Sequence, residues 1–304
     1  AGRPSHSGMH RTTAGVRTDW LDEERHLTLQ SEVLSARLQL PLAEEAELTG
    51  AQLFARLKQR MDGDSEVLIQ AYLDHRQRYQ PNLMDQHLNA LDFDLQHSVR
   101  LGRRHNLVWG GGHRYIHDNT VGSARAFFIP ERKLMNWTSL FAQNDIDLFD
   151  AVHLTLGVKL ERNPYTGWES LPNLRLSYAP SRANYLLWGA LSRSVRSPSR
   201  FDRELFMTAD DSQLNSRELI HKGSPDFVSE IARVVEFGYR AQPRHNLSLS
   251  TTFFYSQYDR LRTLEPEPDV MLTRDSALVL GALRGVVVTT RVGATGRACH
   301  VGLL

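Results

Sequence analysis

The strongest constraint in the sequence is a two-residue alternation of apolar and polar side chains that recurs over most of its length. A period of two places alternate side chains on opposite faces of a β-strand. Residues 91–100 and 247–256 show the pattern, and residues 152–161 show it most clearly. In that segment Val152, Leu154, Leu156, Val158 and Leu160 alternate with His153, Thr155, Gly157, Lys159 and Glu161. We therefore expect an all-β chain.

The length of the alternating segments indicates what kind of β protein this is. We count about a dozen of them between Val16 and Tyr258, many of about 10 to 13 residues. This is about twice the length of a usual globular strand, and it is close to what a tilted bilayer crossing requires. Strand length therefore favours transmembrane strands over a soluble sandwich.

The connections between these segments are expected to alternate in length. Short turns are predicted near residues 22–24, 61–64, 101–104, 148–150, 180–183 and 242–244. Longer polar connections are predicted at residues 38–48, 77–89, 117–134, 162–171 and 194–229. Tight periplasmic turns and long outer loops are typical of a membrane barrel, whereas a Greek-key sandwich does not sort its connections in this way. We predict a transmembrane antiparallel up-and-down β-barrel.

The composition excludes several other classes of protein. With 41% hydrophobic and 23% charged residues, general disorder is not expected. The 36 Lys and Arg against 35 Asp and Glu give no basic excess, so we expect no nucleic-acid partner. The most apolar run, residues 277–288, is too short for a membrane helix and carries Arg284. The sequence contains no Gly-x-Ser-x-Gly, His-Glu-x-x-His or paired-Cys motif, so we expect neither an enzyme nor a cofactor.

The pattern changes after Tyr258. Residues 259–304 contain no Phe, Trp or Tyr, and they hold the single cysteine, Cys299, which leaves no partner for an internal disulfide. We divide the chain into a poorly defined N-terminal segment (1–14), a partial barrel (15–260) and an atypical tail (261–304). The tail is expected to be frame-shifted or disordered. The alternative is an ordinary loop followed by two unusual strands.

Several motifs together resemble the TonB-dependent outer-membrane receptors. Residues 136–146 followed by 154–161 look like the mid-barrel hairpin of that family, and residues 171–177 leading into 187–199 are similar to its next stretch. Residues 223–230, 235–239 and 253–259 resemble the series that follows. Each motif is short, but their order and spacing are specific. Residues 104–118 extend the resemblance, which covers about residues 15–260.

The resemblance implies a barrel of about 22 strands filled by an N-terminal plug domain. This chain would supply about 12 of those strands in the bacterial outer membrane, in contact with its lipid. The implied function is uptake of a ferric siderophore or a similar metal chelate, with energy from TonB delivered through a plug domain absent from this chain. We expect the partial chain not to be competent alone. The alternatives are a passive porin-like barrel or surface adhesin, and a non-functional truncated gene product.

The longest predicted loop supplies the candidate ligand-binding residues, which are Arg193, Arg196, Arg200 and Arg203. In a water-filled barrel mouth, guanidinium groups would attract an anionic ferric chelate. The alternative is structural, because Asp202 and Glu204 lie among them and charged lumen residues are common in barrels. In that case the arginines pair with acidic side chains or with the plug.

Two further motifs are expected to have no chemical role. His113 and His117 would lie about 13 Å apart along one face of a strand, too far for joint chelation, so we expect no metal site there. The glycines at positions 110–112 lack the Lys-Ser/Thr and the helix of a phosphate loop. Within a strand they would admit a close neighbour, such as the plug, or relieve curvature.

Overall fold

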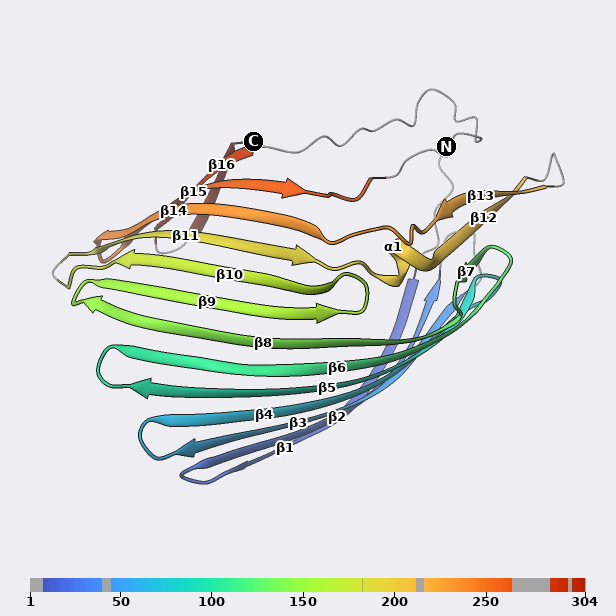
Figure 1. Cartoon of the computed structure of the whole chain (residues 1–304), viewed down its shortest axis with the longest axis horizontal. Helices are drawn as coiled ribbons and strands as arrows, with labels where there is room; N and C mark the ends of the chain where they lie inside the picture. Colours follow the sequence, from blue (N-terminus) through green and yellow to red (C-terminus); the bar gives the residue numbers. More distant parts are fainter. Residues whose placement is uncertain are drawn as a thin grey trace.

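The computed structural model describes residues 8–39, 45–181, 183–211, 216–263, 285–294 and 297–303. Within these residues the chain is almost entirely antiparallel sheet (Figure 1). The main sheet follows chain order from β1 to β17 and omits only β7, β12 and β13, which form a small separate sheet. None of the described helices is long and apolar enough to cross a membrane.

Twelve strands of the main sheet lie between residues 8 and 259. They are β1 (Gly8–Leu21), β2 (Arg25–Gln39), β3 (Ala46–Met61), β4 (Ser65–Gln80), β5 (Met84–Leu101), β6 (His105–Gly122), β8 (Arg132–Phe149), β9 (Val152–Asn163), β10 (Gly167–Tyr178), β11 (Tyr185–Arg196), β14 (Glu230–Arg244) and β15 (Leu247–Asp259). The predicted dozen up-and-down strands is thereby confirmed. The first strand begins earlier than expected, and several strands reach 18 residues.

The connections are only partly as predicted. Tight turns at residues 22–24, 62–64, 102–104 and 150–151 are confirmed, and they share one end of the sheet, here called the turn end. At the opposite end, here called the loop end, the predicted long connections at 77–89 and 162–171 are wrong, because only three residues separate β4 from β5 and β9 from β10. The polar residues there belong to strands: Gln77 and Arg78 pair with His87 and Gln86 in the β4–β5 ladder.

The long connection between β11 and β14 has structure of its own. It contains the helix α1 (Arg200–Glu204) and the strands β12 (Leu205–Asp211) and β13 (Ser216–Lys222). Strand β12 also pairs with β7 (Ala126–Phe128), which lies in the connection between β6 and β8. Two loop-end connections that are far apart in sequence are therefore joined into one small sheet.

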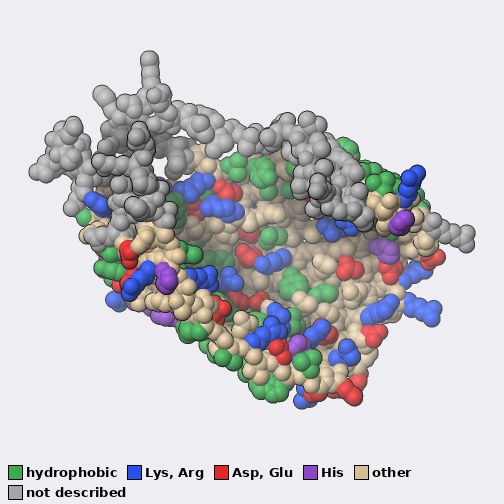
Figure 2. Space-filling view, turned by 180° about the vertical axis from the view of Figure 1, so that it is seen from behind, with side chains coloured by type: hydrophobic (Ala, Val, Ile, Leu, Met, Phe, Trp, Pro, Cys, Tyr) green, Lys and Arg blue, Asp and Glu red, His purple; other side chains and the backbone are tan. Residues whose placement is uncertain are grey.

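The two faces of the main sheet differ in the way the alternation predicts. Large apolar side chains on one register, here called outward, are substantially exposed; examples are Leu53, Leu73, Phe93, Leu191 and Phe237. The opposite, inward register carries charged and polar groups, including Arg114 and Asp92, which form an ion pair. In Figure 2 the hollowed face shows basic and acidic side chains mixed across it. An apolar outside and a polar inside match the two environments of a membrane barrel.

Outward aromatic side chains lie at both ends of β10. Trp168 is at the loop end and Tyr178 at the turn end, and both are exposed. The strand between them rises about 33 Å at ~3.3 Å per residue. Tilted by about 40°, this covers the apolar band of about 25 Å in an outer-membrane barrel. Tyr178, Tyr185 and Tyr239 form a row across three neighbouring strands at the turn end, with adjacent ring centroids 6.3 Å apart.

The glycines of β6 admit close neighbours, as predicted, and these neighbours belong to adjacent strands. A Cβ atom on Gly110 would lie 2.1 Å from the carbonyl oxygen of Leu95, and one on Gly112 would lie 2.2 Å from Oδ1 of Asp94. Both contacts are with β5, which pairs with β6 along its whole length.

Two further strands, β16 (Gly285–Ala294) and β17 (Arg297–Leu303), follow β15 in the sheet. Their backbones pair antiparallel, β16 with β15 and β17 with β16. This is the arrangement of the alternative interpretation of the tail. Residues 264–284 and the side chain of Cys299 lie outside the described residues.

Candidate functional site

The arginine-rich segment folds as a short helix at the loop end of the barrel. Ser199 caps the N-terminus of α1 in a capping box with Asp202. The Ser199 backbone N–H donates to Oδ2 of Asp202 at 2.9 Å, and its hydroxyl donates to the same oxygen at 2.7 Å. Reciprocal capping satisfies backbone groups that a short helix would otherwise leave unpaired. The capping contacts of this helix are therefore made within the segment itself.

Arg200 connects this helix to the barrel wall. Its Nη1 lies 2.8 Å from Oδ2 of Asp118 in β6, and its Nε lies 2.8 Å from Oε2 of Glu204. It also donates to the carbonyl oxygen of Pro130, and its guanidinium lies 4.5 Å from the ring centroid of Phe128. The Arg200 side chain is only 6% exposed. A buried guanidinium with this many partners holds the loop in place.

A second group of charges surrounds Asp202. Arg196 in β11 pairs with Asp202 at 3.0 Å and with Glu230 at 3.2 Å, and Arg262 pairs with Asp202 at 3.3 Å. Burial acts to raise the pKa of Asp202. The hydrogen bonds from Ser199 and Arg196 outweigh it, and the pKa of this carboxyl is held below its ordinary value.

The third group surrounds Tyr165, in the turn between β9 and β10. Lys133 pairs with Glu204, and its ammonium lies 4.3 Å from the Tyr165 ring centroid. Arg203 lies 5.2 Å from the same ring and donates to the carbonyl oxygen of Tyr165 at 3.2 Å. Burial, with the nearby Glu204 carboxylate, raises the pKa of the Tyr165 phenol well above its ordinary value. The phenol therefore stays neutral at physiological pH.

Arg193 lies apart from these groups. It is on the outward register of β11, beside Leu191, where β10 and β11 separate. Its Nη2 lies 3.2 Å from Oε2 of Glu169, and its Nη1 donates to the carbonyl oxygen of Ser170. Among the described residues, Arg193 has no direct hydrogen-bond or ion-pair partner in common with Arg196, Arg200 or Arg203.

The structure thus separates the four predicted residues by their partners. Arg193, Arg196 and Arg200 each form an ion pair with a carboxylate, which is the structural alternative stated for them. Arg203 pairs with no carboxylate among the described residues and contacts Tyr165 instead. Sequence reasoning missed Asp118, Lys133 and Tyr165. They come from strands and a turn far from the arginines, and their only signal is an inward or loop-end position.

Polar groups continue down the inward face below this cluster. Lys159 and Glu161 pair at 2.8 Å, and Thr155 donates to Asp145 at 2.6 Å. The two histidines of β6, in contrast, face outward. His113 and His117 both lie on the outward register of this strand, and His113 Nδ1 lies 2.9 Å from the Thr138 hydroxyl. The described residues contain no group of His, Cys, Asp and Glu side chains that could hold a metal ion.

Comparison with known families decides the assignment. Residues 6–297 match the model of the TonB-dependent receptor-like β-barrel. This chain belongs to that family. The family and the similar solved structures are bacterial outer-membrane proteins, which places the chain in the bacterial outer membrane. No match was found among curated protein sequences.

Solved structures with this fold include several siderophore receptors. The siderophore receptor PirA from Pseudomonas aeruginosa is 13% identical, with a TM-score of 0.70 over 94% of this chain and 53% of PirA. The ferric enterobactin receptor PfeA from the same organism, in complex with enterobactin, is 13% identical, with a TM-score of 0.71 over 95% and 49%. The alcaligin receptor FauA from Bordetella pertussis is 15% identical, with a TM-score of 0.63 over 97% and 53%. The chain spans about half the length of these receptors.

Proposed function

We propose that this chain forms part of the wall of a receptor that imports a ferric siderophore, or a similar metal chelate, across the bacterial outer membrane. Energy would come from TonB through a plug domain of the receptor. The observation that carries the proposal is a wall of long strands, apolar outward and polar inward, whose fold is that of siderophore receptors.

The loop-end cluster supports a role in shaping the ligand entrance. Asp118, Glu204, Asp202 and Glu230 neutralise Arg196, Arg200, Lys133 and Arg262, so most of the cluster's charge is compensated within the protein. Compensated charges hold a loop in position but attract an anionic chelate weakly. We assign Arg196 and Arg200 to positioning the loop.

Arg203 is the residue we propose for direct ligand contact. Its guanidinium packs on the Tyr165 ring and makes a hydrogen bond with a backbone carbonyl, which leaves further donors of its planar fork available. Because Arg203 has no carboxylate partner in the part of the chain that the structure describes, its guanidinium charge stays available to a ligand in the mouth. An anionic catecholate or hydroxamate chelate fits this chemistry.

The test is uptake of radioactive iron by a bacterial host that lacks its own siderophore receptors and produces the complete receptor whose wall contains this chain. Ferric enterobactin is the probe, because one of the similar structures is a ferric enterobactin receptor in complex with enterobactin. We expect iron to accumulate in cells that have TonB and not in cells that lack it. Accumulation that persists without TonB would indicate a passive pore. Absence of accumulation by protein that is correctly inserted would contradict the siderophore assignment.

The contribution of Arg203 is tested in the same cells. We expect Arg203→Gln to weaken ferric enterobactin binding several-fold without lowering the amount of protein in the outer membrane. Arg37→Gln is the matched control, because Arg37 is an exposed outward arginine paired with Glu47 at 3.3 Å. If the two variants bind ferric enterobactin with equal affinity, Arg203 is not part of the binding site.

A further inference from the structure

The outward face of the wall has an apolar groove across β9, β10, β11 and β14, with a volume of about 680 Å³. One side of it is a cross-strand row of apolar residues: Leu156 pairs with Leu174, Leu174 with Leu191, and Leu191 with Val235. The neighbouring row, toward the loop end, begins with Val158 and Pro172 and continues with Arg193 and Arg233. The groove therefore has an apolar side and a basic end.

Pro172 accounts for the groove. Proline has no backbone N–H and cannot donate to a sheet ladder. Pairing between β10 and β11 ends at Asn173 and Ser192, immediately beside it, and the two strands separate toward the loop end. The compact ring of Pro172 and the small side chain of Ala142 leave space on the outward face that leucines would fill.

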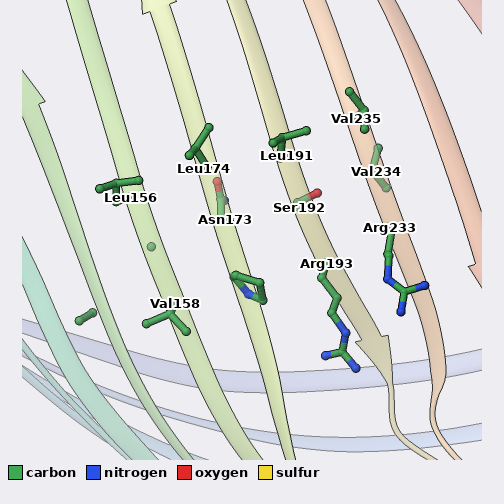
Figure 3. Close-up of a pocket in the computed structure, with 13 residues that line it drawn as sticks. Leu156, Val158, Asn173, Leu174, Leu191, Ser192, Arg193, Arg233, Val234 and Val235 are labelled. Carbon is green, nitrogen blue, oxygen red and sulfur yellow. The ribbon is translucent and has the colours of Figure 1, made fainter.

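The two arginines point toward the loop end. In Figure 3 the guanidinium groups of Arg193 and Arg233 extend from neighbouring strands in the direction of the β11 arrowhead, away from Leu191 and Val235. Arg233 pairs with Asp259 and its side chain is 54% exposed. Arg193 uses Nη1 and Nη2 for Ser170 and Glu169. A guanidinium has five N–H donors, so both retain donors for an incoming anion.

The height of the groove in the membrane identifies what covers it. Pro172 and Leu174 lie between Trp168 and Tyr178, the two exposed aromatic residues that bracket the apolar band on β10. Acyl chains therefore face the leucine row. The guanidinium groups of Arg193 and Arg233 extend from this level to Ser170 and Asp259, toward the loop-end interface where lipid headgroups begin.

We propose that this groove binds one anionic membrane lipid, with an acyl chain along Leu156, Leu174 and Leu191 and a headgroup phosphate on Arg193 and Arg233. Phosphate oxygens accept charge-assisted hydrogen bonds from arginine, often in bidentate geometry. The exposed guanidinium of Arg233 is the main contact, and Arg193 supports it from the next strand. The proposal depends on the chain lying in a bilayer and not on which ligand the receptor imports.

The test is native mass spectrometry of the protein extracted from outer membranes, cleared of lipid in detergent and then incubated with phosphatidylglycerol or with phosphatidylcholine of the same acyl chains. We expect the wild type to retain one phosphatidylglycerol and at least several-fold less phosphatidylcholine. The double variant Arg193→Gln/Arg233→Gln should lose this preference. Ala142→Phe, which fills the groove, should lower retention of both lipids.

Matched controls separate the groove from the general effect of outward charge. Arg37→Gln removes an outward, carboxylate-paired arginine on β2, and Ala51→Phe adds an outward ring on β3; neither residue lines the groove. Both controls should retain lipid as the wild type does. Equal retention in the double arginine variant and the wild type, or equal loss in Arg37→Gln, would overturn the proposal. Failure of the wild type to retain phosphatidylglycerol would also overturn it.

Discussion

Arg200 in α1 and Asp118 in β6 form an ion pair with an Nη1–Oδ2 distance of 2.8 Å, although 82 positions separate them in the sequence. Both side chains are almost fully buried, and Gln86 of β5 donates to the other Asp118 oxygen at 2.9 Å. A short helix in a long loop is thereby attached to the loop-end part of β6 in the barrel wall.

Asp118→Asn should release the loop. Removing one partner of a buried ion pair leaves an uncompensated charge and costs about 3–5 kcal/mol. We expect residues 197–229 to become sensitive to protease and to exchange amide hydrogens faster, while the strands stay protected. Limited proteolysis followed by mass spectrometry measures this. Arg37→Gln serves as the control, because an exposed pair contributes at most about 1 kcal/mol.

A double variant tests whether the loop is released because the ion pair is broken or because either position is changed at all. In Asp118→Leu/Arg200→Met both charges are absent, and an apolar pair can replace a buried ion pair with little loss. Protection of the loop should recover substantially, although Glu204 then keeps only Lys133 as an ionic partner. Loop protection unchanged in Asp118→Asn would show that α1 is held by its other contacts.

The fold could largely be predicted because the face of a strand is a local property. Leu91 and Phe93 alternate with Asp92 and Asp94, and this alone separates outward from inward without knowledge of any partner strand. The length of the strands could not be predicted as well. Because the inner face is polar and hydrated, strand residues such as Gln77 and Arg78 are of the same polar types that are common in loops.

The candidate site was less predictable for a different reason. The arginines stand close together in sequence, but Asp118, which pairs with Arg200, comes from β6, and Lys133, which pairs with Glu204, comes from β8. They lie near α1 in a structure where the strand that follows α1, β12, pairs with β7 in the β6–β8 connection. Nothing within a few residues of Asp118 or Lys133 indicates such a long-range contact.

Gly238 should tolerate no larger residue while Trp188 is present. The two are register partners in β14 and β11, and a Cβ atom on Gly238 would lie 2.2 Å from the Trp188 indole. We expect Gly238→Ala to destabilise the barrel by about 1–3 kcal/mol through overpacking. Urea unfolding in detergent measures the change. Gly189→Ala, where the nearest atom is 3.6 Å away, should have a much smaller effect.

A double-mutant cycle tests whether the cost of Gly238→Ala comes from contact with the Trp188 indole. Trp188→Ala should remove most of the cost of Gly238→Ala, so the two substitutions should be strongly non-additive. Additive effects would mean that Gly238 is required for backbone conformation and not for space beside the indole.

The attachment of α1 should weaken at acid pH. Hydrogen bonds hold the pKa of Asp202 below its ordinary value of about 4, so its carboxylate stabilises the folded loop when ionised. That contribution is fully present above about pH 5 and is lost as the pH falls through the ordinary pKa toward the lowered value. Hydrogen exchange at the amides of residues 199–204, corrected for intrinsic rates, should show decreasing protection in this range.

Asp202→Asn is the matched variant for the acid transition, because it removes the titrating group but keeps similar size. Its loop should be less protected at neutral pH and should lack the pH dependence below pH 5. A wild-type protection factor that stays constant down to pH 3 would contradict a stabilising role for the Asp202 carboxylate.

Two neighbouring residues of β3 can test the orientation of the wall in the membrane. Leu53 is outward and 48% exposed, whereas Gln52 is inward and accepts a hydrogen bond from the Tyr72 hydroxyl at 3.2 Å. An arginine on the lipid face near the bilayer midplane costs about 2–4 kcal/mol, while a lumenal arginine remains hydrated. Leu53→Arg should therefore reduce assembly into the outer membrane far more than Gln52→Arg, as measured by the fraction of folded protein in purified outer membranes. Equal assembly of the two variants would contradict the assignment of the apolar register to lipid, and a stronger defect in Gln52→Arg would reverse it.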